Sequence, residues 1–318
     1  MPAPENQSNT LSDFRIHIYN CVKIVVILAA CAFAVKFVFL DTIAIKTDQM
    51  SPALMRGDRT LILRTPFIKP FNRLLTPGRG VPLIVKHPLM GKNYACLRVA
   101  GVAGDSIAIS HGSYRIINSP DKTFGTPMAA GEDLPPDYSP RDSMQPFHIP
   151  LKGELLQLDS LGLRDFFFAV AIIKLENLHK TYRVKARLSV EGVIDKGKAL
   201  TDFYLYKGLL DTIPEKYDFD WFFWDRLKEY CNNTFKGKDF SLDIGLFEGN
   251  ERVTNYIVGK SIIFLMADDW RKGFDSRYFG PIPVSLIKGR PIVVLWSWAK
   301  DASWPGIFRI GRILKIVK

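Results

Sequence analysis

The chain has 318 residues, of which 47% are hydrophobic and 24% charged, and these values exclude a disordered or collagen-like protein. Four scattered cysteines exclude a disulfide scaffold and a zinc ribbon. The 43 Lys and Arg residues outnumber the 32 Asp and Glu residues, so the formal net charge of +11 indicates a polyanionic partner, either nucleic acid or a membrane surface.

The N-terminal part divides into a polar and an apolar segment. Residues 1–21 predict a loose tail, and residues 22–40 hold an apolar run at the short end of what spans a bilayer. Two alternatives exist, because Ala32-Phe33-Ala34 fits a cleavage site of a secretory signal and Leu28–Cys31 fits lipoprotein processing. The run continues beyond both sites, so we expect an uncleaved single-pass anchor in the inner membrane, with the N-terminus cytoplasmic and the main domain periplasmic.

The remainder predicts a mostly β fold with an α-containing insertion. Alternating or β-branched runs predict strands at Thr42–Lys46, Arg59–Leu63, Leu83–Val85, Tyr94–Val99, Ser106–Ile109, Ser261–Met266, Ile292–Trp298 and Phe308–Val317. The proline-rich residues 117–150 predict an irregular connection. Leu151–Leu175 and the aromatic-rich Pro214–Tyr230 have helical spacing, and the aromatic residues indicate packing on a sheet rather than a ligand cage. We expect a core domain at 41–116 and 258–318, with 117–257 as an inserted second subdomain.

Four motifs occur in order behind the apolar segment. They are Thr47–Asp58 (TDQMSPALMRGD), Gly78–Pro88 (GRGVPLIVKHP), Tyr94–Asp105 (YACLRVAGVAGD) and Ala267–Pro283 (ADDWRKGFDSRYFGPIP). This series resembles the nucleophile, strand, lysine and Gly-Asp-Asn-Arg boxes of bacterial type I signal peptidases, the leader-peptidase-like family S26. The resemblance implies a signal-peptidase-like β-barrel or β-sheet domain, and a serine endopeptidase that cuts exported chains after Ala-x-Ala.

The groups that carry the family's chemistry are replaced here. Gln49 stands at the nucleophilic serine, Leu97 at the general-base lysine, and Gly273 at the serine that would hydrogen-bond the lysine. A carboxamide is no nucleophile and leucine exchanges no proton, so we expect no catalytic residue at these positions. Thr47 retains a hydroxyl where the family places an oxyanion-type donor, and we interpret it as structural. No cofactor or metal is expected.

A relocated nucleophile is the alternative. Ser51 lies two residues beyond Gln49, with Lys46 and Lys92 nearby in sequence, whereas Cys96 should point away from Leu97 on a strand. The histidines have no spacing typical of a triad or a metal site, and we interpret them as surface or satisfied core residues; they are His87, His111, His148 and His179.

The scaffold residues of the boxes persist. The resemblance implies a substrate cleft that includes Met50, Pro52 and Leu54. It also implies a structural loop, in which Asp275 and Arg277 form a charge-assisted pair; its members are Asp268, Gly273, Asp275, Ser276 and Arg277. Gly57-Asp58 and Gly104-Asp105 are turn signatures.

This pattern predicts a pseudoenzyme that binds signal-peptide-bearing or pilin-like polypeptides as a chaperone or assembly factor in secretion. The alternative is an active S26 peptidase that uses Ser51. A nucleic-acid partner is not expected, because no nucleic-acid fold signature is present. The positive charge is concentrated at residues 59–98 (+8) and 284–318 (+6), which in the family lie against the membrane, so a phospholipid surface is the expected polyanion.

Overall fold

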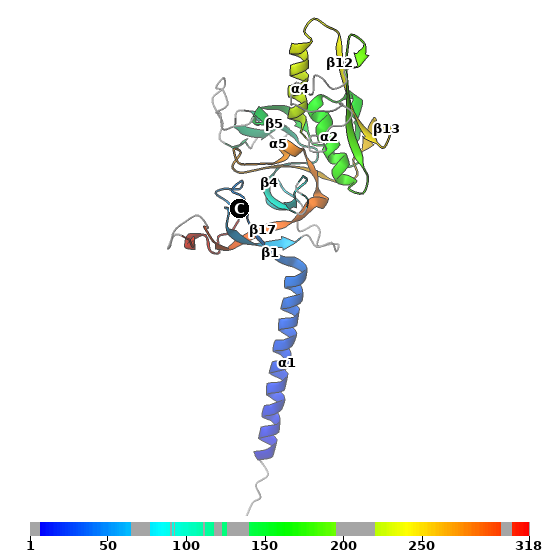
Figure 1. Ribbon diagram of the computed structural model, residues 1–318. Coiled ribbons are helices and arrows are strands. Elements are labelled where there is room, and N and C mark those ends of the chain that lie inside the picture. Colours follow the sequence, from blue (N-terminus) through cyan, green and yellow to red (C-terminus); the bar gives the residue numbers. More distant parts are fainter. Residues whose placement is uncertain are drawn as a thin grey trace, which may run out of the picture.

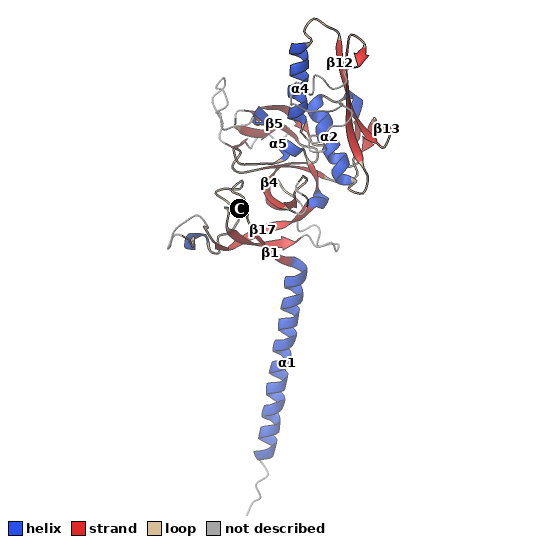
Figure 2. Cartoon of the chain, viewed as in Figure 1, coloured by secondary structure: helices blue, strands red, loops and turns tan. Residues whose placement is uncertain are grey.

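The computed structural model describes residues 7–64, 77–89, 91, 93–110, 112–117, 123–125, 140–194, 220–299 and 307–317. Antiparallel strands dominate the body of these ranges, and a long helix projects from it (Figures 1 and 2). The mostly β class predicted from the sequence is therefore confirmed. His111 and Lys92 lie outside the described residues.

Helix α1 (Gln7–Phe39) corrects two expectations for the N-terminal part. It starts well inside the segment predicted as a loose tail, since no Gly or Pro follows residue 7 before the apolar run. The transmembrane helix predicted at 22–40 is not supported: in the part of the chain described here, no helix is long and apolar enough to cross a membrane. Lys23 and Lys36 leave only a short uninterrupted apolar stretch between them.

A seven-stranded antiparallel sheet forms the base of the body, with strand order β1-β2-β17-β3-β4-β15-β16. Its strands are β1 (Leu40–Ala44), β2 (Asp58–Arg64), β3 (Pro82–Lys86), β4 (Tyr94–Val102), β15 (Ile262–Met266), β16 (Ile282–Pro283) and β17 (Ile287–Ser297). Segments from both ends of the chain thus share this sheet, because β17 pairs with both β2 and β3.

Three smaller sheets complete the described part of the chain, and those that contain β5 and β12 lie above the seven-stranded sheet in Figure 1. One contains β5 (Ser106–Ser110), β6 (Ser113–Ile116), β7 (Thr123–Gly125) and β8 (Met144–His148); another contains β10 (Tyr182–Val190), β11 (Val193–Ile194), β12 (Phe240–Glu248) and β13 (Glu251–Val253). The third pairs β9 (Leu155–Gln157) with β14 (Asn255–Ile257). The other helices are α2 (Leu163–Glu176), α4 (Trp221–Thr234) and α5 (Ser276–Phe279), with 3-10 turns η2 (Pro140–Asp142), η3 (Leu158–Ser160), η5 (Val284–Leu286) and η6 (Ile310–Arg312).

Several predicted elements differ from those observed. The helix expected over 151–175 starts only at Leu163, because Gly162 provides its N-cap and β9 precedes it. The irregular connection at 117–150 includes strand β8. Phe308–Val317 is no continuous strand, since single bridges at Phe308 and Ile316 flank the turn η6. β1 lies two residues before the predicted strand.

Aromatic side chains of α2 and α4 form the centre of the hydrophobic core. Phe167 of α2 stacks on Trp224 of α4 with ring centroids 5.5 Å apart, and both are fully buried. The aromatic run at 221–224 therefore packs in the core, where Trp224 contacts helix α2, whereas the sequence predicted packing on a sheet. Ala171 and Leu175, also on α2, pack with Leu97 of the seven-stranded sheet, so this helix joins the upper sheets to the base.

Candidate functional site

Gln49 lies in the turn after β1, where its side chain is tied to the sheet. Its side-chain Nε2 donates to the Cys96 backbone carbonyl at 3.0 Å, and the Gln49 backbone carbonyl accepts the Asp269 N–H at 3.0 Å. The side chain is 6% exposed. Three of the four boxes thus meet at this residue, and a hydrogen-bonded carboxamide occupies the position where the family resemblance places a nucleophile.

Leu97 is the next residue along β4 after the carbonyl that Gln49 contacts. Its side chain is fully buried, pairs across the strands with Leu83, and belongs to an apolar cluster that includes Ala267 and Phe279. Alternation along β4 turns Cys96 to the opposite face, in a separate cluster with Met50. The position of the general base is therefore filled by a packed hydrocarbon.

Gly273 sits where the backbone leaves no room for a side chain. A Cβ at this position would lie 2.3 Å from the Ala267 Cβ and 3.1 Å from the Asp269 carbonyl oxygen. Real Cβ atoms do not approach this closely, so a serine here requires the neighbouring chain to move. Glycine at 273 is therefore required by the close packing of its loop against Ala267 and Asp269.

The hydroxyls that remain nearby lack a base. Thr47 is exposed and Ser51 is half-buried. In the ranges that the structure describes, no lysine amine lies within hydrogen-bond distance of either hydroxyl. The nearest lysine contact in the turn is Lys315 Nζ, which reaches the Pro52 carbonyl at 3.4 Å.

Cys96 is also unsuited to nucleophilic chemistry. The thiol is buried, and this burial raises its pKa well above the ordinary value, with the Asp268 carboxylate adding to the effect. Cys96 and Cys231 are both free thiols, so no disulfide joins them.

His87 is a satisfied core histidine. Its ring stacks on Phe274 with centroids 5.6 Å apart, its Nδ1 accepts the Leu89 N–H at 3.1 Å, and burial lowers its pKa. His148 lies 3.2 Å from Glu154 on the surface. Within the described ranges, no three His, Cys, Asp or Glu side chains are placed to hold a metal ion.

Charged residues of the boxes join them into a frame. Arg98 makes a two-pronged ion pair with Asp268, both distances being 2.7 Å, and so ties β4 to the fourth box. Arg79 makes the equivalent pair with Asp105, at 2.8 and 2.5 Å, and so ties the second box to the third. Such planar, two-point contacts fix orientation as well as distance.

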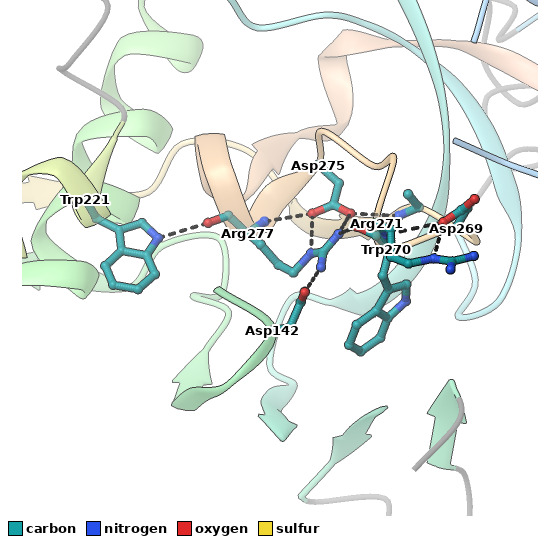
Figure 3. A network of polar contacts seen from close by, with 8 residues as sticks. Asp142, Trp221, Asp269, Trp270, Arg271, Asp275 and Arg277 are labelled. Atoms are coloured by element: carbon teal, nitrogen blue, oxygen red, sulfur yellow. Dashed lines mark hydrogen bonds and ion pairs between the residues drawn. The ribbon is translucent and has the colours of Figure 1, made fainter. Parts of the chain in front are cut away.

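A buried arginine holds the loop that carries Gly273. Arg277 donates from Nε to Asp275 Oδ1 at 2.8 Å and from a second nitrogen to Oδ2 at 2.7 Å, and it also contacts Asp142 (Figure 3). Its carbonyl accepts the indole N–H of Trp221 at 2.9 Å. The Ser276 hydroxyl oxygen accepts the Leu265 N–H at 3.0 Å. The loop is thereby fixed to β15 and to α4.

Asp58 anchors the C-terminal segment to the nucleophile-box turn. Its fully buried carboxylate accepts from Arg312 at 3.0 and 2.5 Å and from the Met55 N–H at 2.9 Å. Burial alone would raise the pKa of Asp58, but these donors and Ser297 outweigh it and hold the pKa below the ordinary value. Gly57 supplies the turn with a positive φ of 93°.

The residues expected to line a substrate cleft divide between core and surface. Met50 and Leu54 are fully buried, packed with Ile62 beneath the sheet, whereas Pro52 is exposed. Met50 and Leu54 therefore belong to the core, and of the three residues only Pro52 is accessible at the surface.

The backbone beside this turn has a free edge. Within the described residues β1 has a single neighbouring strand, β2. Ile45 donates to the Asp58 carbonyl at 2.8 Å and accepts the Gly57 N–H at 2.9 Å, so both its polar groups face β2. Because these groups alternate along an antiparallel strand, those of Ala44 and Lys46 face the open side.

Two functional positions escaped the sequence reasoning. Asp142, the second carboxylate at Arg277, lies in a proline-rich segment that carried no signal. The Asp58–Arg312 pair joins residues far apart in the chain, and only Asp58 lies in one of the four motifs. No local pattern around Arg312 indicated its partner.

Comparison with known proteins points to the same family as the four motifs. The family model for signal peptidase, peptidase S26, matches residues 18–145, which contain the first three boxes. The signal peptidase I of Buchnera aphidicola subsp. Baizongia pistaciae (strain Bp) is 23% identical over 292 residues, which cover 88% of this chain and 78% of that protein. The chain is therefore similar to signal peptidases of family S26, most clearly over the residues that contain the first three boxes.

Proposed function

We propose that this protein binds signal-peptide-bearing or pilin-like polypeptides without cutting them and acts as a chaperone or assembly factor in export. One combination of features carries the proposal. Gln49 is hydrogen-bonded to the Cys96 carbonyl and Leu97 is buried among apolar side chains, so neither offers catalytic chemistry, while the edge of β1 is open within the described residues. The chemistry is removed, and the surface for an extended chain is retained.

Binding requires only backbone groups. An extended peptide added to a free edge pairs its N–H and C=O groups with those of the edge strand. Ala44 and Lys46 offer such groups on the side away from β2. Each hydrogen bond contributes roughly 0.5–1.5 kcal/mol, so several in register support specific binding without a covalent step.

Cleavage has no support in the geometry. Peptide hydrolysis by a serine requires a hydroxyl and a base within hydrogen-bond reach. Ser51, the alternative nucleophile, is half-buried and has no lysine amine beside it in the described part of the chain. The active-peptidase alternative is therefore less well supported than binding alone.

The same end of the domain offers a surface for a membrane. Exposed apolar side chains of the C-terminal segment lie beside β17, and α1 leaves the body at β1, at this end of the molecule (Figure 1). The exposed residues of this C-terminal patch are Trp296, Trp298, Phe308, Ile310, Ile313, Leu314 and Ile316. Large exposed apolar patches with basic neighbours are typical of sites that meet a partner or a lipid surface. We include phospholipid-surface contact in the proposal on this ground.

The test of polypeptide binding uses paired N-methylated ligands. The full-length protein is titrated with a fluorescent signal-peptide segment ending beyond Ala-x-Ala, and with two versions methylated at alternate backbone amides. Only one set of amides can face β1, so one version should bind at least tenfold more weakly than the other. Equal loss for both versions, or for neither, would contradict binding at the strand edge.

A further inference from the structure

A cavity on one face of the seven-stranded sheet adjoins the proposed polypeptide edge, with which it shares Ala44 and Lys46. It has a volume of about 580 Å³ and lies across β1, β2 and β17. Ala44, Arg59 and Trp296 stand in one row of the sheet, because Ala44 pairs with Arg59 and Arg59 with Trp296. Their neighbours Ile43 and Thr60 point to the other face, as the alternation of strands requires.

The lining of the cavity is strongly cationic. Four basic side chains, Lys46, Arg56, Arg59 and Arg309, line it together with a single carboxylate, Asp48. Among the described residues, none of these four cations forms an ion pair with a carboxylate. Clusters of one sign of charge raise the local concentration of counter-ions and substrates of the other sign.

Uncharged groups hold two of the cations in place without neutralising them. Arg309 donates to the Arg56 carbonyl at 3.0 Å, and Arg59 donates to the Thr42 hydroxyl at 3.1 Å while lying 5.6 Å from the centre of the Trp296 ring. The guanidinium groups thus retain further N–H donors for a ligand. Arginine pairs with planar or tetrahedral oxyanions through two such donors.

The rim of the cavity is apolar and continuous with the exposed C-terminal patch. Trp298 also lines the cavity, and its ring lies 4.7 Å from that of Phe308. Trp298, Phe308 and Ile310 expose 44%, 43% and 75% of their surfaces. A ligand that satisfies both parts carries an anionic group next to a hydrocarbon chain.

We propose that this cavity binds the phosphate of an anionic phospholipid, with the acyl chains lying over Trp298 and Phe308. The phosphate lies between Arg59 and Arg309, and Lys46 and Arg56 supply further positive charge beside it. The inference rests on the phospholipid contact in the proposed function and assigns it a lipid class and a site. It concerns the side chains that line the cavity, whereas polypeptide binding at the β1 edge uses backbone groups, so separate assays distinguish the two.

A titration with short-chain lipids tests the site. The full-length protein is titrated with monomeric dihexanoyl phosphatidylglycerol, dihexanoyl phosphatidylcholine, glycerol 3-phosphate and an acidic peptide, and tryptophan fluorescence reports binding. Monomeric lipids separate binding at the cavity from partition of α1 into a bilayer. We expect phosphatidylglycerol to bind at least tenfold more tightly than each of the other three ligands.

Matched variants locate the binding. Lys46→Gln combined with Arg56→Gln removes two exposed cations of the cavity, and Lys185→Gln combined with Arg187→Gln removes the same charge from β10. Each charge near a lipid headgroup contributes about 1 kcal/mol, so the cavity variant should weaken phosphatidylglycerol binding about thirtyfold and the β10 variant less than twofold.

Several results would overturn the inference. Equal affinities for the two lipids would show that the site does not distinguish headgroup charge. Glycerol 3-phosphate binding as tightly as phosphatidylglycerol would identify a soluble phosphate ligand instead. Tighter binding of the acidic peptide would identify a polypeptide site. Equal effects of the two double variants would place the lipid elsewhere. In each case the N-methylated peptide assay remains a separate test of the proposed function.

Discussion

Replacing Leu97 by lysine tests how completely the base position has been converted into core. The Leu97 side chain is fully buried among apolar groups, so a lysine amine there would lose its hydration without gaining a carboxylate from that cluster. Burial of this kind lowers a lysine pKa by about 3–5 units from an ordinary value of about 10.4. The folded Leu97→Lys protein should therefore hold a neutral amine at pH 7.

The loss of folding stability caused by Leu97→Lys follows from this lowering of the lysine pKa. Deprotonating the lysine on folding costs about 4 kcal/mol at pH 7 and about 2 kcal/mol at pH 9, since one pKa unit corresponds to about 1.4 kcal/mol. The sign is that of a depressed folded pKa: the penalty is largest at low pH and disappears as the pH approaches the pKa of the unfolded chain. Leu97→Met keeps the volume and serves as the control, with a cost below about 1.5 kcal/mol at either pH.

The assay is urea unfolding of both variants at pH 7 and pH 9. We expect the difference between Leu97→Lys and Leu97→Met to shrink by about 2 kcal/mol between these values. A difference that does not change with pH would mean that the amine reaches water. In that case the base position is not sealed, and the reasoning from burial fails.

Three other predictions concern the same frame. Gly273→Ser should lower the free energy of unfolding by about 1–3 kcal/mol, because its Cβ overlaps Ala267, and adding Ala267→Gly should restore most of the loss; a stable single variant would contradict this packing. Cys96 should resist alkylation by iodoacetamide in the native protein while the exposed Cys21 reacts, as peptide mapping by mass spectrometry would reveal, and rapid labelling of Cys96 would mean that the thiol is accessible. The pKa of Asp58 is lowered in the folded state, so the stabilisation by its carboxylate is present above about pH 4 and is lost as the pH falls through the folded pKa. The thermal unfolding temperature between pH 3 and pH 6 should therefore depend less on pH in Asp58→Asn than in the unmodified protein. The same pH dependence in both proteins would exclude a contribution from this carboxylate.

The strands of the base sheet could be predicted because their local patterns agree with their final environment. Arg59–Leu63 and Ser261–Met266 are β-branched or apolar runs bounded by turns, and they became β2 and β15. In the insertion, β10 was missed although Val184, Ala186 and Leu188 alternate as buried residues along it. The N-terminal helix was placed too late, since its first turns are mostly polar and give no apolar signal.

The candidate site shows where sequence reasoning stops. The substitutions Gln49 and Leu97 could be read from the motifs, but the Gln49–Cys96 hydrogen bond could not, because it depends on the turn after β1 reaching β4. The crowding at Gly273 likewise arises from Ala267, six residues earlier, once the loop folds back. Contacts across sheet layers are set by tertiary packing, which no local pattern encodes.

The most direct test of binding without cleavage is intact-mass spectrometry of a signal-peptide-bearing protein after incubation with the full-length chain. The same samples are examined for complex formation by size-exclusion chromatography. We predict a complex from which the polypeptide is recovered at its full mass. A shortened product that is absent without the protein, and that disappears with Ser51→Ala, would contradict the account and establish an active peptidase.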